Sequence, residues 1–296
     1  MAKVSIIIPS RNEQFLSKTV DDIFKKATGE IEIIVMLEGY WPEPILEDYD
    51  NLILVHTSQP QGMRPAINSA ASIASGKFLL KTDAHCMFAE GFDEALQIDC
   101  DDDWVVVPRR YSLDAENWDI LETGKKPVDA HYLRYPYYKL DHIAMHGTVW
   151  NQRQEERKNI LIDDEMSSQG SCWFMTKDHF WNCLEGLSPF GYGKFVQEFQ
   201  QIGNMTWLSG GRVVINKKTW YAHLHKGKKY GRGYYMSKKE VINGNYFSVD
   251  FWMNNKWPRR KYDLEWLIDK FSPVPSWEKG WQKHALENEH LIKKYL

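Results

Sequence analysis

The chain has 296 residues, of which 43% are hydrophobic and 26% charged, and its formal net charge is −3. These proportions are typical of a globular protein, and they exclude a disordered chain, a collagen, a coiled coil and a disulfide-stapled miniprotein. At roughly 150 residues per domain, the length fits one large domain or two modest ones.

The cysteine pattern and the hydropathy indicate the compartment. None of the four cysteines forms a C-x-x-C pair, so neither a redox motif nor a zinc knuckle is visible. The apolar run that follows Lys3 is too short for a signal peptide, and no run approaches the ~18 apolar residues of a membrane span. We therefore expect a reduced, cytoplasmic protein without a membrane partner. Its oligomeric state is left open.

Aromatic residues are the one compositional excess, at 14% with 13 Trp. Trp and Tyr are amphipathic, so the excess fits surfaces on which ligands stack, and it fits a Trp-rich core equally well.

The first half of the chain alternates strand and helix signals. A β-branched run over 4–8 ends at Pro9, and further apolar strands are predicted at 31–37, 52–55, 78–80 and 104–107. Helical spacing marks residues 16–27 and 67–74, closed by Gly29 and Gly76. This alternation predicts a doubly wound α/β fold with a mostly parallel sheet. Ligands bind such sheets beyond the carboxyl ends of the strands.

The second half is less regular. The polar stretch 111–165 reads as an insertion or long loop over the sheet, followed by a strand at 171–175 and helices at 180–184 and 194–202. Short strands are predicted at 213–215 and 220–222. We expect one domain over 1–245 and an aromatic-rich, helical C-terminal extension over 246–296.

The strongest chemical motif directly follows the fourth strand, where the chain reads Lys81-Thr82-Asp83-Ala84-His85-Cys86. In an extended segment, residues i and i+2 point to the same side. Asp83 and His85 can therefore hold one divalent cation, for which Mn²⁺ (or Mg²⁺) is the expected ion. Taken alone, this D-x-H spacing is also compatible with an ordinary surface loop.

Five blocks in order make the chain resemble family 2 glycosyltransferases, which have the GT-A fold. They are Val4 to Glu13, the strand ending in Leu37-Glu38-Gly39, Gly62 to Asn68 with Gly76-Lys77-Phe78, Asp83 to Cys86, and Gln169 to Met175 with Gln197-Glu198-Phe199. Leu37 and Glu38 depart from the two aspartates that usually end the second strand. The D-x-H form is more similar to polypeptide N-acetylgalactosaminyltransferases.

The resemblance implies a nucleotide-sugar donor, with UDP as the expected carrier, and a divalent cation that stabilises the charge of the departing diphosphate. His223 stands where the N-acetylgalactosaminyltransferases carry a third metal ligand, so the expected metal ligands are Asp83, His85 and His223. His225 is a rival on the same face. Glu198 is the expected general base of an inverting reaction. In the retaining N-acetylgalactosaminyltransferases the matching acid has no such role.

The donor site is expected to include the loop after the first strand and residues at neighbouring strand ends. Glu38 and Arg64 would flank the nucleobase; a surface ion pair between them is the alternative. Trp173 would offer a ring face to the sugar, or pack in the core. The full set of expected donor-binding residues is Pro9, Ser10, Arg11, Glu13, Glu38, Arg64, Asp83, Trp173, Lys226, Lys229 and Arg232.

The stretch 212–239 carries nine Lys or Arg and neither Asp nor Glu. We interpret part of it as a lid whose cations, Lys226, Lys229 and Arg232 among them, contact the diphosphate. A nucleic-acid track and a solvated basic loop are the alternatives.

The overall expectation is a metal-dependent glycosyltransferase that moves a sugar from a nucleotide-sugar to an acceptor hydroxyl. Neither the sugar nor the acceptor is specified by the sequence. A hydroxylated base in DNA is one alternative acceptor, since the surplus of cations and aromatic residues could bind a polyanion and an extruded base. The rival from another class is a catalytically inactive binding module or a nucleic-acid-binding protein that uses residues 212–239.

Overall fold

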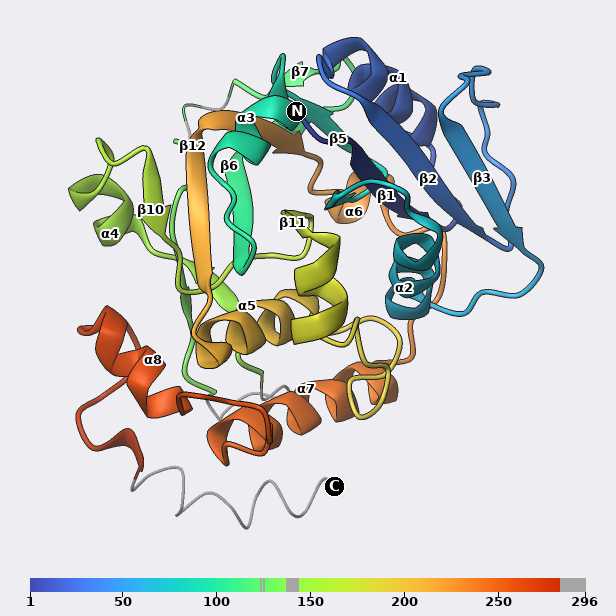
Figure 1. Ribbon diagram of the computed structural model, residues 1–296. Helices are drawn as coiled ribbons and strands as arrows, with labels where there is room; N and C mark the ends of the chain where they lie inside the picture. Colours follow the sequence, from blue (N-terminus) through green and yellow to red (C-terminus); the bar gives the residue numbers. More distant parts are fainter. Residues whose placement is uncertain (123, 125, 137–143, 283–296) are drawn as a thin grey trace.

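One large sheet forms the centre of the protein (Figure 1). The computed structural model describes residues 1–122, 124, 126–136 and 144–282, and within these residues the sheet has ten strands. Eight of them follow the order β10-β12-β6-β11-β4-β1-β2-β3, while β5 pairs with β12 and β7 with β6. A separate hairpin pairs β8 (His131–Leu133) with β9 (Gly147–Val149).

The N-terminal half of the sheet is parallel, as predicted. Its strands are β1 (Val4–Ser10), β2 (Ile31–Glu38), β3 (Leu52–Thr57) and β4 (Phe78–Thr82), with β1 between β2 and β4. Helices α1 (Leu16–Lys26) and α2 (Met63–Ile73) connect them at the expected places. Because β1, β2 and β4 are covered on both faces, their sequences are continuous apolar runs.

The remaining strands make the sheet mixed. Strand β11 (Cys172–Thr176) lies antiparallel between β4 and β6 (Trp104–Asp114), and β12 (Arg212–His223) runs parallel to β6. Strand β10 (Ile162–Asp164) closes the edge, and β5 (Cys86–Phe88) and β7 (Asp119–Ile120) are short additions. The two short strands expected at 213–215 and 220–222 are one strand, β12, with a register shift between Asn216 and Trp220.

The two faces of the sheet carry separate cores. One face packs α1 and α3 (Phe92–Ile98) against alternate residues of β1, β2 and β4. The other packs α2, a π-helical turn η1 (His179–Cys183), α5 (Glu198–Ser209), α7 (Lys238–Met253) and α8 (Leu264–Phe271) (Figure 1). This second core buries Trp150, Trp173, Trp207, Trp252, Trp257 and Trp281. Much of the tryptophan excess therefore serves packing.

Two further expectations for the second half need correction. The stretch 111–165 is more than a loop, because β6 extends to Asp114, β10 joins the sheet, and helix α4 (Asn151–Glu156) and the β8–β9 hairpin lie in it. Its residues Leu133, Met145 and Trp150 belong to the main core. The helix expected at 194–202 begins only at Glu198.

The expected boundary at 245/246 falls inside α7, which begins at Lys238. Helix α7 buries Val249 and Trp252 in the same core as the sheet, and α8 adds Leu264 and Leu267. The C-terminal extension is thus helical and packed on the sheet domain as far as it is described. Residues 283–296 lie outside the described residues.

A buried histidine in this core makes folding sensitive to acid. The His179 imidazole is 5% exposed, its Nε2 lies 2.9 Å from Oγ1 of Thr206, and burial lowers its pKa to about 4. The unfolded value is about 6.5, so the unfolded chain binds more protons between these two values. The contribution of neutral His179 to the free energy of unfolding is therefore fully present above pH 6.5 and is lost as the pH falls toward the folded-state pKa.

We expect wild type to lose about 2 kcal/mol more unfolding free energy than His179→Asn between pH 7 and pH 5, at ~1.4 kcal/mol per pKa unit below 6.5. Urea unfolding of both proteins at the two pH values measures this difference. Equal losses would contradict the assignment of the acid sensitivity to His179.

Candidate active site

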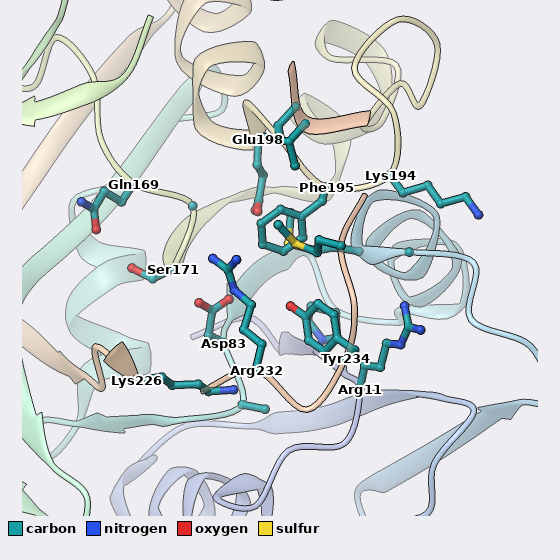
Figure 2. Close-up of a pocket in the computed structure, with 18 of the residues that line it drawn as sticks. Arg11, Asp83, Gln169, Ser171, Lys194, Phe195, Glu198, Lys226, Arg232 and Tyr234 are labelled. Carbon is teal, nitrogen blue, oxygen red and sulfur yellow. The ribbon is translucent and has the colours of Figure 1, made fainter. Parts of the chain in front are cut away.

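A cavity of about 1270 Å³ lies beyond the carboxyl ends of β1, β2 and β4, on the side of the sheet predicted for ligands. Its wall comes from segments far apart in the sequence, as Figure 2 shows for Arg11, Asp83, Glu198 and Arg232. The predicted site residues that line it are Pro9, Ser10, Arg11, Glu13, Glu38, Asp83, His85, Glu198, His223, Lys226 and Arg232.

Three predicted metal ligands meet in this cavity. Asp83, His85 and His223 each offer one ligand atom, and these atoms lie within 4.8 Å of one another. Oδ2 of Asp83 is 3.3 Å from Nε2 of His223 and 3.9 Å from Nε2 of His85. The three ligand atoms are therefore close enough together to bind one cation between them.

Backbone pairing fixes this arrangement. Asp83 and His85 lie in the link between β4 and β5, and the Asp83 amide donates to the carbonyl of Ser171. His223 ends β12 and is paired with Cys86 of β5, while the Leu224 amide donates to the carbonyl of His85. His223 is 138 residues beyond His85 in the sequence, and the pairing of β12 with β5 brings it next to Asp83 and His85.

The electrostatics suit cation binding. Burial alone would raise the pKa of Asp83, but Lys81 and the two imidazoles outweigh it and hold that pKa well below its usual value. Burial lowers the pKa of His223 to about 4, so the ring is neutral at pH 7. Both ring nitrogens of His223 are buried without a hydrogen bond of good geometry. A buried, neutral imidazole without such bonds is suited to ligate a metal.

His225, the rival ligand, lies differently. It is exposed, two residues beyond the end of β12, although it lines the cavity and packs edge-on against His223. Among the described residues, the only group of three or more potential ligands within metal-binding distance includes His223 rather than His225. The geometry favours His223.

Glu13 connects this cluster to the basic segment. Its carboxylate pairs with Nζ of Lys226, and its Oε2 lies 3.3 Å from Nδ1 of His85. Burial would raise the pKa of Glu13, but His85 and Lys226 together lower it. Lys226 therefore lies at the cavity wall, held beside the metal cluster by an ion pair.

Glu198 is the first residue of α5, and its carboxylate points into the cavity (Figure 2). Oε1 accepts a hydrogen bond of 2.6 Å from Nε1 of Trp173, and Oε2 lies 3.4 Å from Nζ of Lys81. Burial raises the pKa of this carboxyl, although Lys81 opposes the shift. A Cβ atom at residue 170 would lie 2.6 Å from Oε2, so only glycine leaves room for this carboxylate.

Three predicted donor-binding residues do not line the cavity. Trp173 is fully buried and stacks on Phe180, and its indole N–H donates to Glu198. It therefore offers no ring face to a sugar. Arg64 is also fully buried; it donates to carbonyls of the loop before α5 and to Oε1 of Gln201. Lys229 is exposed and pairs with Glu116 outside the cavity.

The other predicted donor contacts remain accessible from the cavity. Oε1 of Glu38 accepts the amides of Gln61 and Gly62, which fixes the loop leading to α2, and it does not pair with Arg64. The Arg11 guanidinium lies 5.1 Å from the centroid of the Tyr234 ring, and Arg232 lies 5.7 Å from that of Phe195. Tyr234 and Phe195 also line the cavity (Figure 2).

The nine cations of 212–239 do not form one surface. Arg212 pairs with Asp164, Lys218 with Asp99 and Lys229 with Glu116, and Lys217 donates to the carbonyl of Arg157. Of the nine, only Lys226 and Arg232 line the cavity. With Lys226 paired to Glu13, four of the nine cations pair with a carboxylate.

Sequence reasoning assigned no role to several cavity residues. Lys81 had a detectable signal, because a charged residue within the buried apolar strand Phe78–Thr82 is unusual. His146 and Gly147 come from the stretch regarded as an insertion, and Phe195 precedes the true start of α5. Nothing in the local sequence marks these three as cavity residues.

The fold, the cavity and the Asp–His–His cluster are the features expected of a glycosyltransferase of GT-A fold. The family model described as "Glycosyl transferase family 2" matches residues 5–184, more than half of the chain. The chain therefore belongs to glycosyl transferase family 2. A comparison with curated proteins finds no match.

Two solved structures with a similar fold are distant from this chain in sequence. A crystal structure of GalNAc-T7 with UDP, GalNAc and Mn²⁺ superposes with a TM-score of 0.69 at 15% identity, over 97% of this chain and 55% of that one. Residues 1–349 of S. aureus TarS, in complex with UDP-GlcNAc, superpose with a TM-score of 0.56 at 13% identity, over 90% of this chain and 69% of that one. The chain thus spans about half the length of the GalNAc-T7 chain. At these identities the likeness concerns the fold.

No helix among the described residues combines the length and the apolar character needed to cross a membrane.

Proposed function

We propose that the protein transfers a sugar from a UDP-sugar to an acceptor hydroxyl, with Mn²⁺ or a similar cation held by Asp83, His85 and His223. The observation that carries the proposal is the three-ligand cluster that lines the cavity in a chain of glycosyl transferase family 2. The two complexes described above, one with UDP and Mn²⁺ and one with UDP-GlcNAc, support the choice of donor.

The cluster fits the cation by its chemistry. One carboxylate oxygen and two imidazole nitrogens suit Mn²⁺ and similar ions, and the buried ring nitrogens of His223 lack other partners of good geometry. Bound there, the cation would act as a Lewis acid on the diphosphate.

The chain's own residues would orient the donor. Pro9, Ser10, Arg11 and Glu38 line the end of the cavity formed by β1 and β2, where we place the nucleoside. Lys226 and Arg232 lie on the wall formed by the segment after β12, where they can contact the diphosphate. Lys226 would then exchange its Glu13 partner for phosphate oxygens.

We assign Glu198 as the general base of an inverting transfer. Its carboxylate lines the same cavity as Asp83, and burial raises its pKa, which makes the carboxylate a stronger base. The cavity of about 1270 Å³ exceeds the ~300–1,000 Å³ typical of a single small ligand, so an acceptor can occupy it with the donor.

The acceptor is proposed only as a hydroxyl compound. A nucleic-acid acceptor would need a continuous basic surface, whereas Arg212, Lys218 and Lys229 are each paired with a carboxylate. This pairing gives the nucleic-acid hypothesis no support.

Calorimetry with UDP and a set of UDP-sugars, with MnCl₂ or with EDTA, tests the proposal. We expect binding of UDP that depends on Mn²⁺, and slow donor hydrolysis with one UDP-sugar. A protein that binds and hydrolyses none of the UDP-sugars with any divalent cation would refute the proposed function.

A further inference from the structure

Lys81 is a buried cation in the lining of the cavity. It belongs to β4, its side chain is 1% exposed, and it is enclosed by two carboxylates and a backbone carbonyl. All of these neighbours are hydrogen-bond acceptors and two of them are carboxylates, so the side chain is an ammonium.

Each hydrogen of this ammonium has an acceptor. Nζ lies 2.7 Å from Oδ1 of Asp83, 2.6 Å from the carbonyl oxygen of Gly170 and 3.4 Å from Oε2 of Glu198. A lysine has three donors and no acceptor. With all three donors directed at protein atoms, Lys81 has none left for a substrate.

The hydrogen bond from Lys81 gives the two carboxylate oxygens of Asp83 different partners. Oδ1 is held by Lys81, and Oδ2 faces His223 and His85 at 3.3 and 3.9 Å. Asp83 can therefore present only Oδ2 to a cation shared with the imidazoles. Without the ammonium, the carboxylate is free to rotate, and its repulsion from Glu198 is no longer neutralised.

The same strand pair holds Glu198. Lys81 of β4 is directly opposite Trp173 of β11 in the register of the sheet, so the two side chains lie next to each other on one face. Trp173 donates to Oε1 of Glu198 at 2.6 Å, and Lys81 lies 3.4 Å from Oε2.

We propose that Lys81 is a positioning residue that fixes Asp83 for cation binding and, together with Trp173, holds the Glu198 carboxylate at the cavity. This inference rests on the proposed function, because it takes Asp83 as a metal ligand. Lys81 acts through the two carboxylates and does not contact the substrate.

The test is Mn²⁺ binding, measured by electron paramagnetic resonance with UDP present and absent, which requires no acceptor. We expect Lys81→Met to weaken Mn²⁺ binding at least tenfold and to lower the kcat of donor hydrolysis more than it raises KM. Lys77→Met is the matched control, because Lys77 lies beside β4 and pairs with Asp102 at the exposed surface. The control should bind Mn²⁺ as wild type does.

Two further variants separate positioning from folding. The double variant Lys81→Met with Glu198→Gln removes one cation and one anion, so its buried charge stays balanced. We expect it to bind Mn²⁺ at least tenfold more weakly than Glu198→Gln alone. In Lys81→Ala, n-propylammonium replaces the missing atoms, and it should restore Mn²⁺ binding where 1-propanol does not.

The outcomes distinguish the two proposals. Suppose that wild type binds Mn²⁺. If Lys81→Met then binds Mn²⁺ within twofold of wild type, or the double variant within twofold of Glu198→Gln, the role of Lys81 is overturned and the proposed function is not. Restoration by 1-propanol as effective as by n-propylammonium would also overturn it, since the site would then need volume rather than charge. Wild type that does not bind Mn²⁺ at all would refute the proposed function and this inference together.

Discussion

Asp83→Ala is expected to weaken Mn²⁺ binding by more than about 100-fold and to abolish metal-dependent UDP binding, because loss of even an outer-shell partner of a metal typically costs 10–100-fold. His85→Ala and His223→Ala should act in the same direction, since each removes one of three clustered ligand atoms. All three residues lie at strand ends rather than in a strand interior, so the fold should persist. Calorimetry with MnCl₂ and UDP measures the effect.

His225→Ala discriminates between the two candidate histidines. His225 is exposed and outside the cluster of ligand atoms, so we expect Mn²⁺ affinity to change only a few-fold. A loss in His225→Ala as large as that in His223→Ala would move the third ligand to residue 225. If the Asp83, His85 and His223 variants keep the Mn²⁺-dependent UDP affinity of wild type, the assignment of the metal site to these residues is wrong.

Glu198→Gln is expected to lower the rate of sugar transfer by about 10²- to 10⁴-fold, the usual contribution of a general base. Glutamine retains an acceptor for the indole N–H of Trp173, so donor binding should be nearly unchanged. Because burial raises the pKa of Glu198, the acid limb of the kcat/KM profile should lie above the ordinary glutamate value of about 4.3. Activity should therefore fall as the pH decreases through this raised pKa.

Glu116→Gln is the control for that measurement, because Glu116 is exposed and pairs with Lys229 outside the cavity. NMR of the product anomer gives an independent check. An anomer inverted relative to the donor agrees with Glu198 as base, while retention of configuration would rule that role out whatever the rate of the variant.

The parallel half of the sheet could be predicted from the sequence, because β1, β2 and β4 are buried on both faces and their local sequences are continuous apolar runs. The D-x-H motif could be placed at the site for the same reason, since it directly follows β4. The start of α5 was less predictable. Residues 194–197 fit a helical pattern, but the loop they form is held by Arg64, which donates to the carbonyl of Val196.

The sequence by itself determined the α/β class, the strand ends where ligands bind and the pair Asp83 and His85, because all of these depend on local periodicity and neighbouring positions. Only the tertiary structure decided which side chains enter the cavity. Trp173 and Arg64 are buried, and Lys229 is drawn to Glu116, since partners distant in the sequence compete for each side chain. The choice of His223 over His225 and the placement of Lys81 between two carboxylates likewise depend on strand register and on α5, which no local pattern specifies.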